Sequence, residues 1–361
     1  MNNSKVLVGM SGGVDSSVAA ALLLDEGLEV SGATMKLFND EDILPNGRAC
    51  CPSTGSGDAV SVCEKLGIEH MDFLFAEQFR EKVMRGFARG YVEGKTPNPC
   101  VDCNKNIKFG LMLERAGVLG FTHIATGHYA RIEYDTVSGR YLLKRAADRS
   151  KDQSYVLYNM GQEELERTML PLGDLTKSRV REIAEEKGLV NAQKSESQDI
   201  CFVPDGDYVR FLTEKMGVET APGDVIDTRG NIIGRHRGVL HYTIGQRRGL
   251  GMGFNGKKYV VDKDTERDTV TVGESHDLMC GKFLVSGVNL ISVAEFTRPL
   301  EVTVMARYRD RETSAVIEPA DGGMALVTLV EPKRAVTPGQ SAVFYSGDVV
   351  VGGGVIERRI M

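Results

Sequence analysis

The run Ser11-Gly12-Gly13-Val14-Asp15-Ser16 follows directly after the apolar segment Lys5-Val6-Leu7-Val8-Gly9-Met10. A glycine-rich turn between a strand and a helix presents unpaired backbone N–H groups and the positive end of the helix dipole to a ligand. Adjacent glycines let the backbone approach phosphate oxygens closely, and the serine hydroxyls are further donors. Residues 11–16 are therefore predicted to form a phosphate-binding loop between a buried strand and a helix.

Asp15 is the unusual residue of this loop, because a carboxylate beside phosphates is repulsive. It fits the loop if it holds Mg²⁺, which would then bridge the carboxylate and the phosphates. We therefore predict that Asp15 is a catalytic residue and a Mg²⁺ ligand. The loop lacks the Lys-Ser/Thr ending of a Walker loop and the glycine spacing of a dinucleotide fingerprint, which excludes both of those classes.

The first 200 or so residues alternate between strand and helix patterns. The predicted strands are 5–10, 29–35, 69–74 and 122–126, and the predicted helices are 14–25, 58–66, 76–92 and 176–187. This order predicts an α/β domain with a parallel sheet covered by helices on both faces, and ligands of such sheets bind at the carboxyl ends of the strands. Residues 39–57 and 93–104 are predicted to be long functional loops.

The second half of the chain has a different sequence pattern, in which short runs of strand-forming residues are separated by glycine and charged turns. The runs 238–244, 258–262 and 269–272 are predicted strands. The chain is thus expected to contain an α/β domain over 1–205, a small β-rich central domain over 206–280, and a C-terminal β-barrel over 281–361.

The composition is that of a globular protein, with 361 residues, 42% hydrophobic and 26% charged. No apolar run reaches the roughly 20 residues that cross a bilayer, and the N-terminus leads at once into a strand, so a cytoplasmic protein is expected, without membrane contact. The net charge of −6 does not favour nucleic-acid binding, which would need a local basic surface such as residues 144–151, 235–248 or 307–311.

Seven cysteines, an odd number without framework spacing, indicate a reducing compartment. Cys103 and Cys201 both lie in polar, loop-like segments, which favours reactive thiols: one could carry sulfur as a persulfide and the other could release it. The residues alone leave three alternatives open. Either cysteine could be inert, Cys100 and Cys103 could be half of a zinc site, or Cys100, Cys103 and Cys201 could hold an iron–sulfur cluster. Cys50 and Cys51 are expected to be non-catalytic.

The loop at 11–16 resembles the signature of the N-type ATP pyrophosphatases, the PP-loop superfamily, which cleave ATP between the α and β phosphates. Further motifs occur in order along the chain: TPNPCVDCN (96–104), ATGHYA (125–130), KDQSY (151–155), SQDICF (197–202), TIGQRRGL (243–250) and ARYR (306–309). Together they closely resemble the tRNA-specific 2-thiouridylase family over essentially the whole chain.

The resemblance implies a reaction in which ATP, with Mg²⁺, adenylates the C2 oxygen of the wobble uridine of a tRNA. A cysteine persulfide then delivers sulfur to C2, and AMP leaves. The resemblance places ATP on the following residues: Gly9, Met10, Ser11, Gly12, Gly13, Val14, Asp15, Ser16, Met35 and Gly127. It also makes Cys201 the acceptor of sulfur from a donor protein, and Cys103 the nucleophile that ends in a disulfide with it.

The remaining residues carried over would contact the tRNA. Asn98, Pro99 and Cys100 would line the pocket of the target base. The others would contact the rest of the tRNA: His128, Lys151, Asp152, Gln153, Arg307, Tyr308 and Gln340. Some family members have Asp where this chain has Cys100, which leaves open which cysteine reacts and whether transfer is redox or cluster-dependent. A monomer is expected. An amidotransferase and an iron–sulfur RNA-binding protein are the alternative functions.

Overall fold

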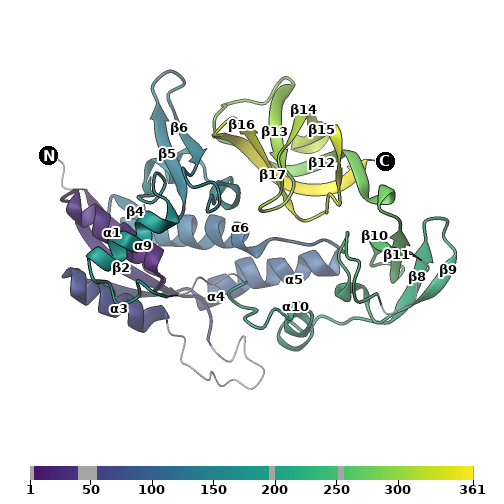
Figure 1. Cartoon of the computed structure of the whole chain (residues 1–361), viewed down its shortest axis with the longest axis horizontal. Helices are drawn as coiled ribbons and strands as arrows, with labels where there is room; N and C mark the ends of the chain where they lie inside the picture. The colour runs from purple at the N-terminus through teal and green to yellow at the C-terminus, as the bar shows by residue number, and fades with distance from the viewer. Residues whose placement is uncertain (1–3, 40–54, 195–199, 251–255, 361) are drawn as a thin grey trace. The chain divides into compact units, whose positions relative to one another are not determined.

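The computed structural model describes residues 4–39, 55–194, 200–250 and 256–360, and the chain divides into two compact units. Unit 1 comprises Met1–Val83, Cys100–Gly206 and Asp348–Val350. Unit 2 comprises Met84–Pro99, Asp207–Gly347 and Val351–Met361. Colour in Figure 1 follows the chain from the purple strands of unit 1 to the yellow strands of unit 2.

Unit 1 is built on a five-stranded parallel sheet with the order β3-β2-β1-β4-β7. The strands are β1 (Lys5–Gly9), β2 (Glu29–Lys36), β3 (His70–Leu74), β4 (His123–Ala125) and β7 (Thr168–Met169). The chain runs outward from β1 through β2 to β3 and then returns to the other side of β1 at β4. The strand order therefore reverses between β1 and β4, where the carboxyl ends of the strands leave a crevice for a ligand.

The strand and helix that flank the glycine loop are as predicted. Val6, Leu7 and Val8 are fully buried, as expected for a central strand covered on both faces. Helix α1 (Val14–Asp25) begins immediately after Gly13 and packs against α9 (Lys177–Glu186), as Figure 1 shows. Helix α3 (Gly55–Leu66) contacts β2 and α1. Apolar side chains of these elements form one core, including Val18, Val62 and Val180.

The predicted loop 93–104 is wrong in its second half. Helix α6 (Pro99–Cys103) begins at Pro99 and continues through a π-helical stretch (Asn104–Leu111) into α7 (Met112–Val118). Proline is well placed at the first position of a helix, because its fixed φ suits the helix and its missing N–H would have no partner there. A helix therefore starts inside the segment that was expected to be a loop.

The remaining elements of the first half include one hairpin that the sequence patterns did not predict. It consists of β5 (Ala130–Asp135) and β6 (Arg140–Arg145). The predicted helix 76–92 is present as three successive pieces: α4 (Ala76–Phe79), a π-helical stretch (Arg80–Met84) and α5 (Arg85–Val92). The short helices are a 3₁₀ turn (Ser154–Leu157) and α8 (Gln162–Glu166).

Unit 2 contains a four-stranded sheet with the order β10-β11-β8-β9. Its strands are β8 (Gly223–Asp227), β9 (Ile232–His236), β10 (Tyr259–Asp264) and β11 (Thr269–Gly273). It follows α10 (Tyr208–Arg210) and a π-helical stretch (Phe211–Lys215). The predicted strand 238–244 is wrong: Gly238 has a φ of 137°, and a 3₁₀ turn (Val239–His241) follows it. A φ of this sign breaks an extended strand.

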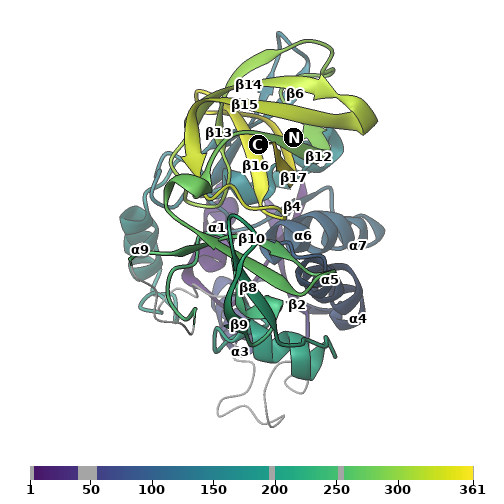
Figure 2. The same ribbon diagram turned by 90° about the vertical axis from the view of Figure 1, so that its right-hand side faces the viewer.

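The predicted C-terminal β-barrel is confirmed. Six antiparallel strands follow the order β12-β15-β14-β13-β16-β17, and β12 pairs with β17 to close the barrel. The strands are β12 (Met279–Leu290), β13 (Leu300–Met305), β14 (Thr313–Ala320), β15 (Met324–Arg334), β16 (Ser341–Ser346) and β17 (Val349–Ile360). Figure 2 shows these strands in yellow and green, wrapped around one another. Across the described residues, no helix has the length and apolar character needed to cross a bilayer.

Candidate functional site

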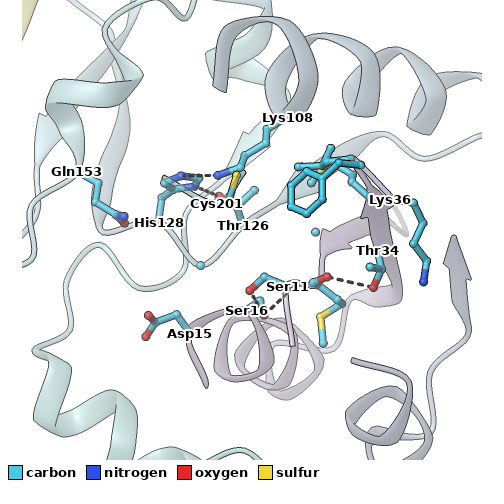
Figure 3. Close-up of a pocket in the computed structure, with 16 residues that line it drawn as sticks. Ser11, Asp15, Ser16, Thr34, Lys36, Lys108, Thr126, His128, Gln153 and Cys201 are labelled. Atoms are coloured by element: carbon cyan, nitrogen blue, oxygen red, sulfur yellow. Dashed lines mark hydrogen bonds between the residues drawn. The ribbon is translucent and has the colours of Figure 1, made fainter. Parts of the chain in front are cut away.

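A cavity of about 620 Å³ lies in unit 1 at the carboxyl ends of β1, β2 and β4. The lining residues come from the glycine loop, the end of β2, the π-helical stretch Asn104–Leu111, the end of β4, the start of the 3₁₀ turn Ser154–Leu157 and the segment around Cys201: Gly9, Met10, Ser11, Asp15, Ser16, Thr34, Met35, Lys36, Leu37, Phe38, Lys108, Thr126, Gly127, His128, Gln153 and Cys201. Figure 3 shows the labelled side chains around this space. The strand reversal point and the cavity therefore coincide, as parallel-sheet topology predicts.

The glycine loop is held in shape by its own hydroxyl groups. Ser16 Oγ accepts from the Ser11 N–H at 3.2 Å and donates to the Gly13 carbonyl at 3.0 Å. Ser17 Oγ donates to the same carbonyl at 3.1 Å. Gly12 has a φ of 71°, which a side chain would strain. The buried hydroxyls of Ser16 and Ser17 thus shape the loop, and the exposed Ser11 hydroxyl stands where it can meet a ligand.

Two predicted nucleotide-binding residues from other strands lie beside this loop. A Cβ on Gly127 would come within 2.7 Å of the Asp15 carbonyl carbon and the Ser16 nitrogen, so only glycine allows the end of β4 to approach the start of α1 this closely. Met35 lines the cavity near the end of β2, together with Leu37 and Phe38. One cavity is therefore lined both by polar loop groups suited to phosphates and by apolar side chains.

Two residues beyond α9 support the loop, and sequence reasoning missed both. Asn191 Nδ2 donates to the Gly12 carbonyl at 3.2 Å and to Ser17 Oγ at 2.9 Å. Lys194 Nζ donates to the same carbonyl at 3.2 Å and to Asp58 Oδ2 at 2.6 Å. Asn191 is 179 positions and Lys194 is 182 positions from Gly12, so no local pattern connects them to the loop.

Asp15 is already paired with a cation of the protein. Lys177 Nζ lies 2.7 Å from Asp15 Oδ1 and 2.8 Å from Oδ2, and the Tyr129 hydroxyl donates to Oδ1 at 2.7 Å. Among the described residues, no group of three or more His, Cys, Asp or Glu side chains could hold a metal ion. One carboxylate that an ammonium group already neutralises does not fit a Mg²⁺ site by itself. The Mg²⁺ role of Asp15 stays a prediction.

The structure places the two predicted reactive cysteines in different settings. Cys103 ends helix α6 and is 8% exposed, so the expectation of a loop-like segment is wrong for it. Cys201 is exposed, lies in a turn and lines the cavity. Negative charge on Cys103 or Cys100 raises the pKa of Cys201, so the three sulfur atoms lie close enough to sense one another. The fold thus brings together thiols that are 98 positions apart.

Burial raises the pKa of all three thiols. Cys201 opens to the cavity but has protein on its other sides, and this desolvation, together with the charges of Cys103 and Cys100, raises its pKa to about 12. The positive charge of Lys108 acts in the opposite direction on each of the three. The described residues hold no metal-binding group of three or more side chains that includes these thiols, and the zinc and iron–sulfur alternatives stay hypotheses. Cys50 and Cys51 lie outside the described residues.

His128 is nearly buried and lies against the cavity wall. Its Nδ1 is 2.8 Å from Thr126 Oγ1, and its Nε2 is 3.4 Å from Lys108 Nζ, as the dashed lines in Figure 3 show. Burial and the nearby Lys108 charge lower the pKa of His128 well below 6.5. The predicted contact between His128 and tRNA could only be made through the cavity.

The other predicted tRNA residues fall in two groups. In unit 1, the Asp152 carboxylate accepts from the Ala146 N–H at 2.9 Å and pairs with Arg145 at 3.4 Å, while Gln153 Oε1 accepts from the Tyr129 N–H. The side chains of Asp152 and Gln153 therefore hold the backbone of unit 1 in place. Lys151, the residue before them, is half-buried. In unit 2 lie Asn98, Pro99, Arg307, Tyr308 and Gln340. Gln340 Nε2 donates to the Thr96 carbonyl at 2.6 Å, and Arg307 is exposed.

Three family models match this chain in succession. They are described as a tRNA methyl transferase HUP domain over residues 4–205, a tRNA methyl transferase PRC-barrel domain over 209–274, and an aminomethyltransferase beta-barrel domain over 280–356. The order is that of the observed architecture: parallel-sheet domain, small central domain, β-barrel.

Curated relatives match over nearly the whole chain. The chain is 47% identical over 361 residues to the tRNA-specific 2-thiouridylase MnmA of Acetivibrio thermocellus, covering 99% of this chain and 100% of the relative. It is 46% identical over 358 residues to the protein of the same name from Clostridioides difficile, covering 99% of both.

Similarity to solved structures is weaker. NMN synthetase from Francisella tularensis matches with a TM-score of 0.35 and 16% identity, over 61% of this chain and 79% of that one. A 4-thiouridine synthetase–RNA complex with bound ATP matches with a TM-score of 0.34 and 14% identity, over 59% and 50%. Likeness at this level carries no functional argument.

Proposed function

The chain belongs to the tRNA-specific 2-thiouridylase family, and from that premise we propose that it is an ATP-dependent tRNA sulfurtransferase that places sulfur on C2 of the wobble uridine. One observation carries the proposal. A single cavity has the glycine loop Gly9–Ser16 on one side and the exposed thiol of Cys201 on another. A phosphate-binding loop and a sulfur carrier in one cavity suit a reaction that first activates an oxygen and then replaces it.

In the first step, the uracil C2 oxygen attacks the α-phosphorus of ATP and pyrophosphate leaves. A uracil carbonyl is a poor electrophile until its oxygen becomes part of a leaving group, and an adenylyl ester provides one. The N-terminus of α1 binds the phosphates through its unpaired N–H groups and its dipole. Met35, Leu37 and Phe38 offer an apolar wall for the adenine. Mg²⁺ bound with ATP would neutralise phosphate charge.

In the second step, the terminal sulfur of a Cys201 persulfide attacks C2, and AMP leaves with the electron pair of the C2–O bond. Cys103 then attacks the Sγ of Cys201. The bond between Cys201 and the transferred sulfur breaks, 2-thiouridine leaves, and a Cys103–Cys201 disulfide forms. A cellular dithiol must reduce this disulfide before the next cycle, and a donor protein must supply the sulfur. The neighbouring thiols of Cys103 and Cys201 support this order.

We also propose the division into domains over 1–205, 206–280 and 281–361, with the last domain contacting tRNA. Its share of the contacts would include Arg307, Tyr308 and Gln340. Asn98, Pro99 and Cys100 would surround the target base, which a protein can receive in a pocket because a wobble base is single-stranded. Exposed basic groups such as Arg307 would bind the phosphates.

The test is incubation of the purified protein with ATP, a sulfide source and tRNA, followed by mass spectrometry of the nucleosides and mapping of the modified position. We expect 2-thiouridine at the wobble position and one AMP for each sulfur transferred. Cys201→Ala should abolish the product while ATP still binds. Cys280→Ala, which removes a buried thiol of the barrel, is the matched control and should stay active. Full thiolation by Cys201→Ala would refute the persulfide assignment.

A further inference from the structure

Three side chains at the cavity wall form a chain that the proposed reaction leaves unused. Thr126 and His128 follow β4, and Lys108 lies on the π-helical stretch Asn104–Leu111. Thr126 Oγ1 is 2.8 Å from His128 Nδ1, and His128 Nε2 is 3.4 Å from Lys108 Nζ. Thr126 and His128 are both more than nine-tenths buried, so their positions are well constrained.

The direction of the hydrogen bonds follows from Lys108. An ammonium group can only donate, so His128 Nε2 accepts from it, and Nδ1 must carry the ring proton and donate to Thr126 Oγ1. The imidazole is therefore neutral. This agrees with the lowered pKa of His128, which burial and Lys108 both cause. A neutral ring holds the ammonium group in place without cancelling its charge.

Lys108 and the Cys201 thiol belong to the wall of the same cavity. Figure 3 draws both side chains beside His128, on the opposite side of the cavity from Ser11 and Ser16. Lys108 is the cation that favours the thiolate form at Cys100, Cys103 and Cys201. Asp102, on α6, acts against it at Cys103. Thiols that the surrounding protein partly desolvates need such a cation, because desolvation alone would keep them neutral and unreactive.

We propose that Lys108, oriented by the Thr126–His128 pair, is the electrostatic group that stabilises anionic sulfur on Cys201 and Cys103 during sulfur transfer. The inference rests on the proposed function and adds the group that makes the thiols reactive. His128 then acts as a positioning residue behind Lys108. The persulfide of Cys201 and later the Cys103 thiol must each be anionic to attack, so one fixed cation can assist both steps.

The test measures thiol reactivity without ATP or tRNA. Iodoacetamide alkylation is followed from pH 6 to 10, with peptide mass spectrometry resolving Cys103 and Cys201. In Lys108→Met we expect Cys201 to alkylate about tenfold more slowly at pH 8, because loss of the cation raises the pKa of the thiol and leaves less thiolate. Lys108→Arg should restore the rate. Lys105→Met, at an exposed lysine of the same helical stretch, is the matched control.

Two further measurements separate this role from a structural one. His128→Leu removes the acceptor of Lys108 and should slow Cys201 alkylation by a smaller factor, with an unchanged circular dichroism spectrum. In the thiolation assay, Lys108→Met should lower kcat and leave the KM for ATP unchanged. Alkylation of Cys201 in Lys108→Met as fast as in Lys105→Met would overturn the inference. If the wild-type protein shows no thiolation in the assay, the proposed function is overturned, whatever the alkylation rates.

Discussion

The contact between Asp15 and Lys177 links the glycine loop to helix α9 and makes a quantitative prediction. Lys177 is the first residue of α9, and its Nζ lies within 2.8 Å of both Asp15 oxygens. The Lys177 side chain is 11% exposed and that of Asp15 is 31% exposed. The pair is thus neither a surface ion pair nor a fully buried one.

The perturbation is Lys177→Met, which keeps the apolar stem and removes the charge. Loss of one partner of a buried pair costs about 3–5 kcal/mol, whereas an exposed pair contributes about 0–1 kcal/mol. Partial exposure of Asp15 and its remaining bond from Tyr129 place the expected loss of unfolding free energy near 2 kcal/mol. Asp15→Asn in the Lys177→Met background should recover about half, because no unpaired charge remains.

The assay is urea unfolding of the wild type, both single variants and the double variant. A second ion pair joins the same two helices and serves as the matched control: Lys187 Nζ lies 2.8 Å from Asp25, with side chains 30% and 56% exposed. We expect a coupling free energy of about 1–2 kcal/mol for Asp15–Lys177 and below about 0.5 kcal/mol for Asp25–Lys187. Equal coupling in the two pairs would refute the argument that partial burial strengthens the first.

Three other predictions concern the loop, the buried lysine of unit 2 and the metal. Gly127→Ala should lower the free energy of unfolding by about 1–3 kcal/mol and abolish ATP binding, because the new Cβ would lie 2.7 Å from backbone atoms of α1. Gly57→Ala is the control, since a Cβ there would meet no atom within 4 Å. It should change neither property when urea unfolding and ATP titration are measured in the same way. Burial lowers the pKa of Lys263 to about 8 from 10.5, so the folded state binds fewer protons and stability should rise between pH 8 and 10.5. Lys263→Met should remove that rise and stabilise the protein by about 1–3 kcal/mol at pH 7; an unchanged pH profile of unfolding would contradict this. If Asp15 holds Mg²⁺, calorimetric titration should show that Mg²⁺ strengthens ATP binding in the wild type and not in Asp15→Asn.

Prediction from sequence succeeded where neighbours along the chain determine the structure. The apolar run at 5–10 and the glycines after it specify a buried strand, a turn and a helix start, and the structure has all three. Local pattern is a poor guide where one residue type occurs in two kinds of structure. Pro99 is typical of a loop but starts a helix here, and Gly238, inside a predicted strand, turns the chain out of it.

Sequence patterns alone predict the α/β start of the chain, the glycine loop and the C-terminal barrel, and the ordered motifs indicate the family. These features depend on local patterns and on the order of motifs, and both can be recognised in the sequence alone. Which charges meet depends on the packing of the fold. Packing brings Lys177 to Asp15, 162 positions away, and Lys108 to His128 in the cavity that Cys201 also lines. Such pairs arise when strands and helices pack, because electrostatic interactions depend on distance in space and not on separation along the chain.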